Sequence, residues 1–315
     1  PVTVWSATTR LQGGSMAFPE DIGVIDTMMG TTAGTTGTNR YAFLDRALKD
    51  AESANMNFPA QYMFKDVPFS GQARDADGTL EEPPQGPDLL LPFMDRCNVE
   101  IAMVGLRADG TGEGVRCVTE HPDRFVPCFE PDPNAGVEAI RQVRRLHDEF
   151  GLKAVTAFPS GRLPQVPIDA PLMYPLYALC CELDIPIFCC AGIPGPRVPA
   201  APQHVERIDQ VMYDFPELTF VTRHGCEPWE DLAVKLMLKW PGLHYSTSAF
   251  APKHYPQAII DYANTRGADK IIYAGYFPMG LSLDRIFEQL RDLPLRDDVW
   301  PKFLRDNARR VLRLD

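Results

Sequence analysis

Short apolar runs alternate along the chain with segments whose apolar residues recur every three to four positions. Eight of these runs have the length and composition of strands that are covered on both faces. They span residues 23–27, 100–106, 124–129, 153–158, 185–190, 218–223, 243–247 and 270–275. The segments between them are amphipathic: in residues 137–150, Val137, Ile140, Val143 and Leu146 fall on one helical stripe. Further helices are predicted over residues 171–183, 205–215, 229–240, 255–265 and 299–314, the last on the outside of the fold.

This order of strands and helices predicts a parallel sheet that closes on itself. Eight strands, each followed by a helix, favour a (β/α)8 TIM barrel over an open sheet. With 315 residues, 45% of them hydrophobic, the chain can bury a core of full domain size. We therefore expect one barrel domain over residues 1–315.

The segment after the first strand, residues 31–87, is much longer than an ordinary loop. It contains a predicted helix over residues 39–55, an aromatic stretch over residues 58–69 and a tip rich in Gly, Asp and Pro. Loops that follow barrel strands rise from the face where active sites are built. The insertion is therefore predicted to be a lid over the pocket or a subunit contact, with Tyr62 or Phe64 against the pocket.

Charge and composition narrow the classes of partner. A net charge of −11 would repel nucleic acid and anionic membranes. No apolar stretch approaches the roughly 20 residues of a membrane span, and the first residues lack the order of a signal peptide. The eight cysteines are scattered without a CxxC pair, which fits a reducing cytoplasm. We expect a cytoplasmic homodimer or higher homo-oligomer that acts on a small molecule.

Several strand ends resemble the amidohydrolase-related barrel family that includes aminocarboxymuconate semialdehyde, resorcylate and carboxyvanillate decarboxylases and several hydrolases. Residues 24–30 (VIDTMMG) are similar to the family's I-D-x-H-x-H, and residues 185–192 (IPIFCCAG) to L-P-V-x-x-H-x-G. Residues 215–229, with His224-Gly225 and Pro228-Trp229, resemble F-P-x-L…H-G-G…P-W. Residues 271–278 (IIYAGYFP) resemble I-L-F-G-S-D-Y-P, and residues 306–308 resemble the terminal N-A motif.

The departures from the family pattern concern its metal ligands. Where the resemblance implies two histidines, a third histidine and an aspartate, this sequence has Met28, Gly30, Cys190 and Tyr276. Only His224 remains. Glycine has no side chain and methionine is a poor zinc ligand, so we predict no cofactor and no metal site of the family type.

Four residues are candidates for catalysis. His224 is interpreted as a general acid or base, with a relic histidine as the alternative. Cys190 is expected near His224 as a thiolate nucleophile, or else as a small apolar filler. Tyr276 can donate a hydrogen bond to an oxyanion, or form only a packed wall. Asp26 can orient His224 or bind a substrate hydroxyl, or bind the backbone instead.

Other residues near the strand ends are candidates for substrate binding. Arg223, Arg107 and Arg197 can each clamp a carboxylate, although an ion pair is the alternative for each of them. Apolar and aromatic residues suggest a pocket for a hydrophobic or aromatic substrate. These residues are Met28, Tyr62, Phe64 and Phe158.

Three functions remain open. The first is a metal-independent hydrolase that acts on an ester, a lactone or an activated carbon–carbon bond, with His224 as acid or base. The second is a non-oxidative decarboxylase or other lyase of an aromatic carboxylic acid. The third is a catalytically inactive, ligand-binding barrel.

Overall fold

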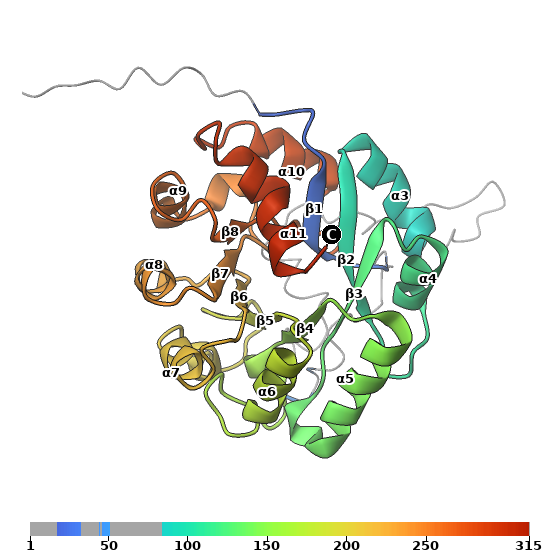
Figure 1. The fold of residues 1–315 in the computed structure, drawn as a ribbon, viewed down its shortest axis with the longest axis vertical. Helices are drawn as coiled ribbons and strands as arrows, with labels where there is room; N and C mark the ends of the chain where they lie inside the picture. Colours follow the sequence, from blue (N-terminus) through green and yellow to red (C-terminus); the bar gives the residue numbers. More distant parts are fainter. Residues whose placement is uncertain (1–17, 33–43, 45, 51–83, 315) are drawn as a thin grey trace, which may run out of the picture.

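The fold is a nearly closed barrel of eight parallel strands, as predicted. The computed structural model describes residues 18–32, 44, 46–50 and 84–314. The strands lie in chain order, each hydrogen-bonded to the next (Figure 1). They are β1 (Val24–Met29), β2 (Val99–Leu106), β3 (Phe125–Phe129), β4 (Ala154–Ala157), β5 (Ile187–Cys190), β6 (Phe220–Arg223), β7 (Leu243–Ser246) and β8 (Ile271–Ile272).

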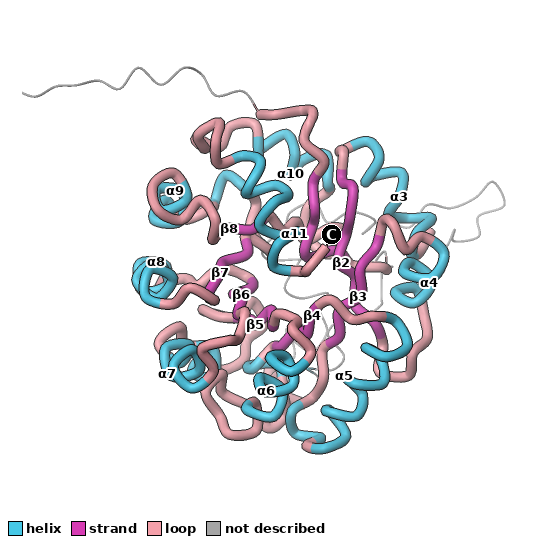
Figure 2. The backbone as a smooth tube through the Cα atoms, viewed as in Figure 1, coloured by secondary structure: helices cyan, strands magenta, loops and turns pink. Residues whose placement is uncertain are grey.

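Helices surround the barrel on the outside (Figure 2). They are α3 (Gly86–Arg96), α4 (Glu113–Glu120), α5 (Val137–Phe150), α6 (Tyr174–Glu182), α7 (Arg207–Asp214), α8 (Glu230–Lys239), α9 (Gln257–Ala263) and α10 (Leu283–Leu290). A last helix, α11 (Asn307–Val311), packs instead at one end of the barrel. The predicted helices over residues 137–150, 171–183, 205–215, 229–240 and 255–265 correspond to α5 through α9. Among the described residues, no helix is long and apolar enough to cross a membrane.

The apolar core has two main layers because alternate residues of each strand face opposite sides of the barrel wall. Residues such as Val155, Phe220 and Tyr245 pack outward against the helices. Phe188 and Val221 belong instead to a cluster that also contains Ala308 and Val311. The end of the chain therefore covers one end of the barrel interior, and the prediction that it lies on the outside is wrong. It forms a π-helical turn (Lys302–Asp306) that runs into α11.

Strand β8 is shorter than the predicted 270–275. Its pairing with β7 stops where the Ala274 amide donates to the side-chain hydroxyl of Thr247, at 3.2 Å, rather than to a backbone carbonyl. On the other side of β8, the backbone N–H of Tyr273 donates to the carbonyl of Phe303 at 3.0 Å. The residues after β8 turn toward β1: the Gly30 amide donates to the carbonyl of Phe277 at 2.8 Å, and the Thr27 hydroxyl donates to the Tyr273 carbonyl at 3.0 Å. These bonds join the first and last strands.

The insertion after β1 leaves and re-enters the barrel at one place. The amide of Gly86 donates to the carbonyl of Thr31 at 2.7 Å. Leu44 and Leu48 are buried in a cluster with Val198, against which Phe158 also packs. Because Phe158 follows β4 and Val198 lies beyond β5, this part of the insertion lies on the side where the strands end. Most of the predicted helix over residues 39–55 lies outside the described residues, as do Tyr62 and Phe64.

Candidate active site

Two of the predicted residues meet at the mouth of the barrel, where the strands end. His224 directly follows β6, and Tyr276 lies four residues after β8. Their rings are in edge-to-face contact, with centroids 5.3 Å apart. The fold thus brings together the one retained histidine and the phenol that replaces the family's aspartate.

The imidazole of His224 is half-buried and lies within hydrogen-bond distance of a serine. Its Nδ1 lies 3.2 Å from the hydroxyl of Ser248, which follows β7. Burial, with a smaller contribution from the nearby Arg223 guanidinium, lowers the pKa of His224 to about 3. The free protein therefore holds His224 as a neutral imidazole at neutral pH.

Arg223, the last residue of β6, reaches across the mouth. Its side chain is only 8% exposed; its Nη2 contacts the sulfur of Met28 on β1, and its Nη1 lies 4.0 Å from a carboxylate oxygen of Glu130. Glu130 directly follows β3 and accepts a hydrogen bond from Arg162 Nη2 at 2.6 Å. The hydroxyl of Thr156 donates to the other Glu130 oxygen at 3.4 Å. Two guanidinium groups thus share one carboxylate.

This cluster of Arg162, Glu130 and Arg223 carries more positive than negative charge. Two arginines against one glutamate leave one positive charge in excess. The Nε atoms of both arginines are buried and have no hydrogen-bond partner among the described residues. A buried cation with unpaired hydrogen-bond donors is energetically costly unless an anion or a water molecule accepts from those donors. The geometry of a guanidinium group suits a carboxylate. The cluster is therefore a candidate anion site.

Cys190 lies beside Arg223 in the sheet, where the two residues are register partners on β5 and β6. Its side chain is buried, and burial raises the pKa of the thiol to about 12, so the thiol stays protonated. Within the described part of the chain it makes no hydrogen bond to His224. These surroundings match the apolar-filler alternative better than the nucleophile.

Asp26 is bound to the backbone of two strands. One carboxylate oxygen accepts from the amides of Met28 and Gly275, each at 2.9 Å. The other oxygen is buried without a partner among the described residues, and burial raises the pKa of Asp26 to about 7. Its contacts join the ends of β1 and β8 and do not orient His224.

The remaining predicted residues lie apart from this group. Arg107 pairs with Asp109 at 2.9 Å, with 71% of its side chain exposed. Arg197 pairs with Asp50 of the insertion, also at 2.9 Å. For both residues the ion-pair alternative describes their contacts. Phe158 packs beside Leu48 of the insertion.

Sequence reasoning missed Glu130, Arg162 and Ser248. Glu130 directly follows a predicted strand, and Ser248 lies one residue beyond another, so the strand-end rule applied to every strand identifies both. Arg162 offers no such signal. It follows a short 3-10 turn (Pro159–Gly161) after β4, and only the folded chain brings it to Glu130.

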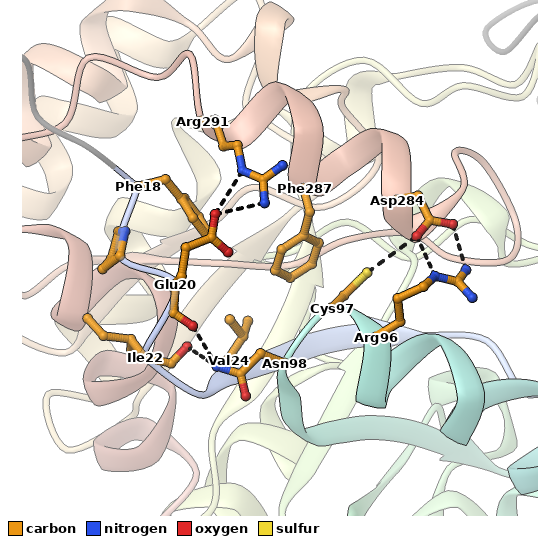
Figure 3. Close-up of a pocket in the computed structure, with 11 residues that line it drawn as sticks. Phe18, Glu20, Ile22, Val24, Arg96, Cys97, Asn98, Asp284, Phe287 and Arg291 are labelled. Carbon is orange, nitrogen blue, oxygen red and sulfur yellow. Dashed lines mark hydrogen bonds and ion pairs between the residues drawn. The ribbon is translucent and has the colours of Figure 1, made fainter.

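A cavity of about 230 Å³ lies elsewhere, beside the starts of β1 and β2 (Figure 3). Phe18, Ile22 and Phe287 form part of its apolar wall. Ion pairs between Arg96 and Asp284 and between Arg291 and Glu20 lie at its edge. Ends of barrels where strands begin usually contribute stability, so this cavity is not the candidate active site.

Residues 115–314 match the amidohydrolase family. The chain belongs to this family. An uncharacterized TIM-barrel protein from Bordetella bronchiseptica has a similar structure, with a TM-score of 0.67 and 22% identity over 93% of this chain and 99% of that one. No curated protein matches the sequence.

Two solved decarboxylases share the fold at low identity. The 2,6-dihydroxybenzoate decarboxylase from Rhizobium has a TM-score of 0.59 and 15% identity, over 93% of this chain and 99% of that one. The 5-carboxyvanillate decarboxylase from Sphingomonas paucimobilis has a TM-score of 0.61 and 16% identity, over 94% and 100%.

The residues at the mouth do not fit the divalent metal that the family resemblance implies. Gly30 has no side chain, Met28 is in contact with Arg223, and Tyr276 has a phenol where the family pattern has an aspartate. Among the described residues, no group of three or more His, Cys, Asp or Glu side chains is placed to hold a metal ion. The excess positive charge of the neighbouring arginines further opposes a dication.

Proposed function

We propose that this barrel is a metal-independent decarboxylase of small aromatic carboxylic acids. One observation carries the proposal: Arg162 and Arg223 share a single carboxylate at the mouth, and Arg223 lies next to His224 in the chain. Together these groups offer an anion site beside a potential proton donor. The two decarboxylases that share the fold are named for 2,6-dihydroxybenzoate and 5-carboxyvanillate, which are aromatic acids, and this supports the same chemical class here.

The charges suggest how His224 becomes an acid. Burial and the Arg223 charge keep the imidazole neutral in the free protein. A substrate carboxylate bound at Arg223 brings a negative charge close to the ring and offsets both effects, which raises the pKa of His224. The bound substrate thus favours the imidazolium that the reaction needs.

The reaction then balances without an oxidant or a cofactor. The bond between the ring carbon and the carboxylate breaks, carbon dioxide leaves, and the electron pair remains on the ring carbon. His224 donates a proton to that carbon and regains one from water. Tyr276, which packs against the imidazole, can donate a hydrogen bond to a ring oxygen that gains charge.

Hydrolysis is the second candidate, and it rests on the neutral state of His224. A neutral imidazole next to a phenol can accept a proton from water while Tyr276 stabilises an oxyanion. An ester or lactone that bears a carboxylate would occupy the same arginines. A binding barrel without catalysis would also bind such anions, but without turnover.

One experiment separates these three functions. Chelator-treated protein is incubated with 2,6-dihydroxybenzoate, 5-carboxyvanillate and a panel of carboxylated lactones, and both carbon dioxide and ring opening are measured. The proposal predicts carbon dioxide release that Arg223→Gln abolishes. Arg107→Gln, at an exposed arginine away from the cluster, should leave the rate unchanged. Ring opening alone supports the hydrolase, and turnover that requires added metal refutes the proposal.

A further inference from the structure

The backbone turn that carries His224 is strained and is held by one side chain. His224 has a φ of 61° and the following Gly225 a φ of 75°, both in the left-handed region. A residue other than glycine adopts this conformation only where its surroundings hold it. Here the amide of His224 donates to the Ser248 hydroxyl oxygen at 3.0 Å, and Ser248 is completely buried.

Ser248 is itself fixed in place by its neighbours. The amide of Thr247 donates to the carbonyl of Ile272 at 3.2 Å, and the amide of Ala249 donates to the carbonyl of Gly275 at 3.3 Å. Both bonds tie the residues after β7 to β8 and the residues that follow it. The serine hydroxyl therefore has a defined position between His224 and the segment that bears Tyr276.

The same hydroxyl faces the imidazole ring. Its oxygen lies 3.2 Å from Nδ1 of His224 while it also accepts the amide of that residue. A serine hydroxyl has one proton to donate. With its oxygen already accepting the amide, donation of that proton to Nδ1 satisfies both groups.

We infer that Ser248 is a positioning residue that fixes His224 in the tautomer with its proton on Nε2. The tautomer itself does not depend on the proposed function. The inference rests on that function only for its consequence, which is that Nε2 exchanges a proton with the substrate. Ser248 then sets both the backbone turn and the direction of proton transfer.

The opposite tautomer, with the proton on Nδ1, would leave a buried hydrogen-bond donor without an acceptor. If Nδ1 carried the proton and donated it to Ser248, the hydroxyl proton would need another acceptor. Ser248 is completely buried, and the described residues provide it with no second acceptor. An unpaired buried donor is costly, so the pairing from Ser248 to Nδ1 prevails.

Nitrogen NMR of histidine tests this assignment without any substrate. The full chain is labelled with ¹⁵N-histidine, and His224→Asn identifies the signals of His224 among the six histidines. At pH 7.5 we expect unprotonated Nδ1 and protonated Nε2 in the wild-type protein. Ser248→Ala should change the tautomer ratio by about fivefold or more, the equivalent of one hydrogen bond of typical net strength.

Two further variants make the result decisive. Ser246→Ala is the matched control, because Ser246 is also buried at the end of β7 but its hydroxyl has no hydrogen-bond partner among the described residues. It should leave the tautomer unchanged. Ser248→Cys keeps the size of the side chain and offers only a weak donor, so it should shift the ratio in the same direction even if Ser248→Ala does not fold.

The outcomes separate this inference from the proposed function. An unchanged His224 tautomer in the folded Ser248 variants, or an equal shift in Ser246→Ala, would overturn the inference. A shifted tautomer together with full turnover by His224→Asn would leave the inference standing and refute the role of His224 in the reaction.

Discussion

Replacing Glu130 by Gln should lower stability while it strengthens the binding of carboxylates. The substitution removes the one negative charge between Arg162 and Arg223 and keeps the shape of the side chain. The free protein then holds two guanidinium groups without a counter-charge, and this lowers the free energy of unfolding. A bound carboxylate gains from the same change because it no longer competes with Glu130.

The size of the stability loss follows from burial. Breaking a fully buried ion pair costs about 3–5 kcal/mol, and an exposed pair contributes about 0–1 kcal/mol. The Arg162 and Arg223 side chains are 16% and 8% exposed, and Glu130 is 34% exposed. Since glutamine retains an oxygen for Arg162, we expect Glu130→Gln to lower the free energy of unfolding by about 1–2 kcal/mol.

Urea unfolding measures the stability, and titration with benzoate measures the affinity. The matched control is Glu182→Gln, which breaks the exposed pair between Glu182 and Arg144 at 2.7 Å. The control should resemble the wild-type protein in both assays. A Glu130→Gln variant with weaker benzoate binding, or with a stability loss no larger than the control's, would refute the assignment of this cluster as an anion site.

Three other residues give predictions of their own. In folded protein at pH 7.5, iodoacetamide should label Cys181, which is partly exposed, and spare Cys190, whose buried thiol has a pKa near 12; equal labelling in a mass-spectrometric time course would contradict this. Burial raises the pKa of Asp26 from 3.8 to about 7. Between these two pH values Asp26 is protonated in the native state and ionised in the unfolded state. Asp26 therefore contributes stability that is lost as the pH rises from about 4 to 7. Urea unfolding at several pH values should therefore show the free energy of unfolding of Asp26→Asn rising relative to the wild type by up to about 1.4 kcal/mol per pH unit in that window, with no further rise above it. A difference that stays constant with pH would disprove the raised pKa of Asp26. Gly275→Ala would place a Cβ 2.5 Å from an Asp26 oxygen. The variant should therefore have a lower melting temperature, which corresponds to a loss of roughly 1–3 kcal/mol in the free energy of unfolding. An unchanged melting temperature would show that the strand ends can move.

The strand and helix pattern was sufficient to predict the barrel because strands covered on both faces are short, apolar and regularly spaced. It was less informative where a long-range contact decides the structure. Strand β8 stops early where the Ala274 amide bonds to the Thr247 side chain, and the end of the chain covers the barrel interior because Ala308 and Val311 match the apolar layer there. Neither partner can be identified from local periodicity.

The site was only partly predictable for the same reason. The resemblance located His224 and Tyr276, and the structure places them in contact. It gave no sign of the charged cluster that Arg162 and Glu130 form with Arg223. Arg162 and Glu130 come from different strand ends and meet only in the folded chain, and the contact between Ser248 and His224 depends on a left-handed turn.

The crystal structure of chelator-treated protein with 2,6-dihydroxybenzoate tests the central claim most directly. The account predicts the ligand carboxylate within hydrogen-bond distance of the guanidinium of Arg223 or Arg162, with the ring beside His224 and no metal ion between them. A ligand held through a metal ion at the mouth, or bound only at the opposite end of the barrel, would contradict it.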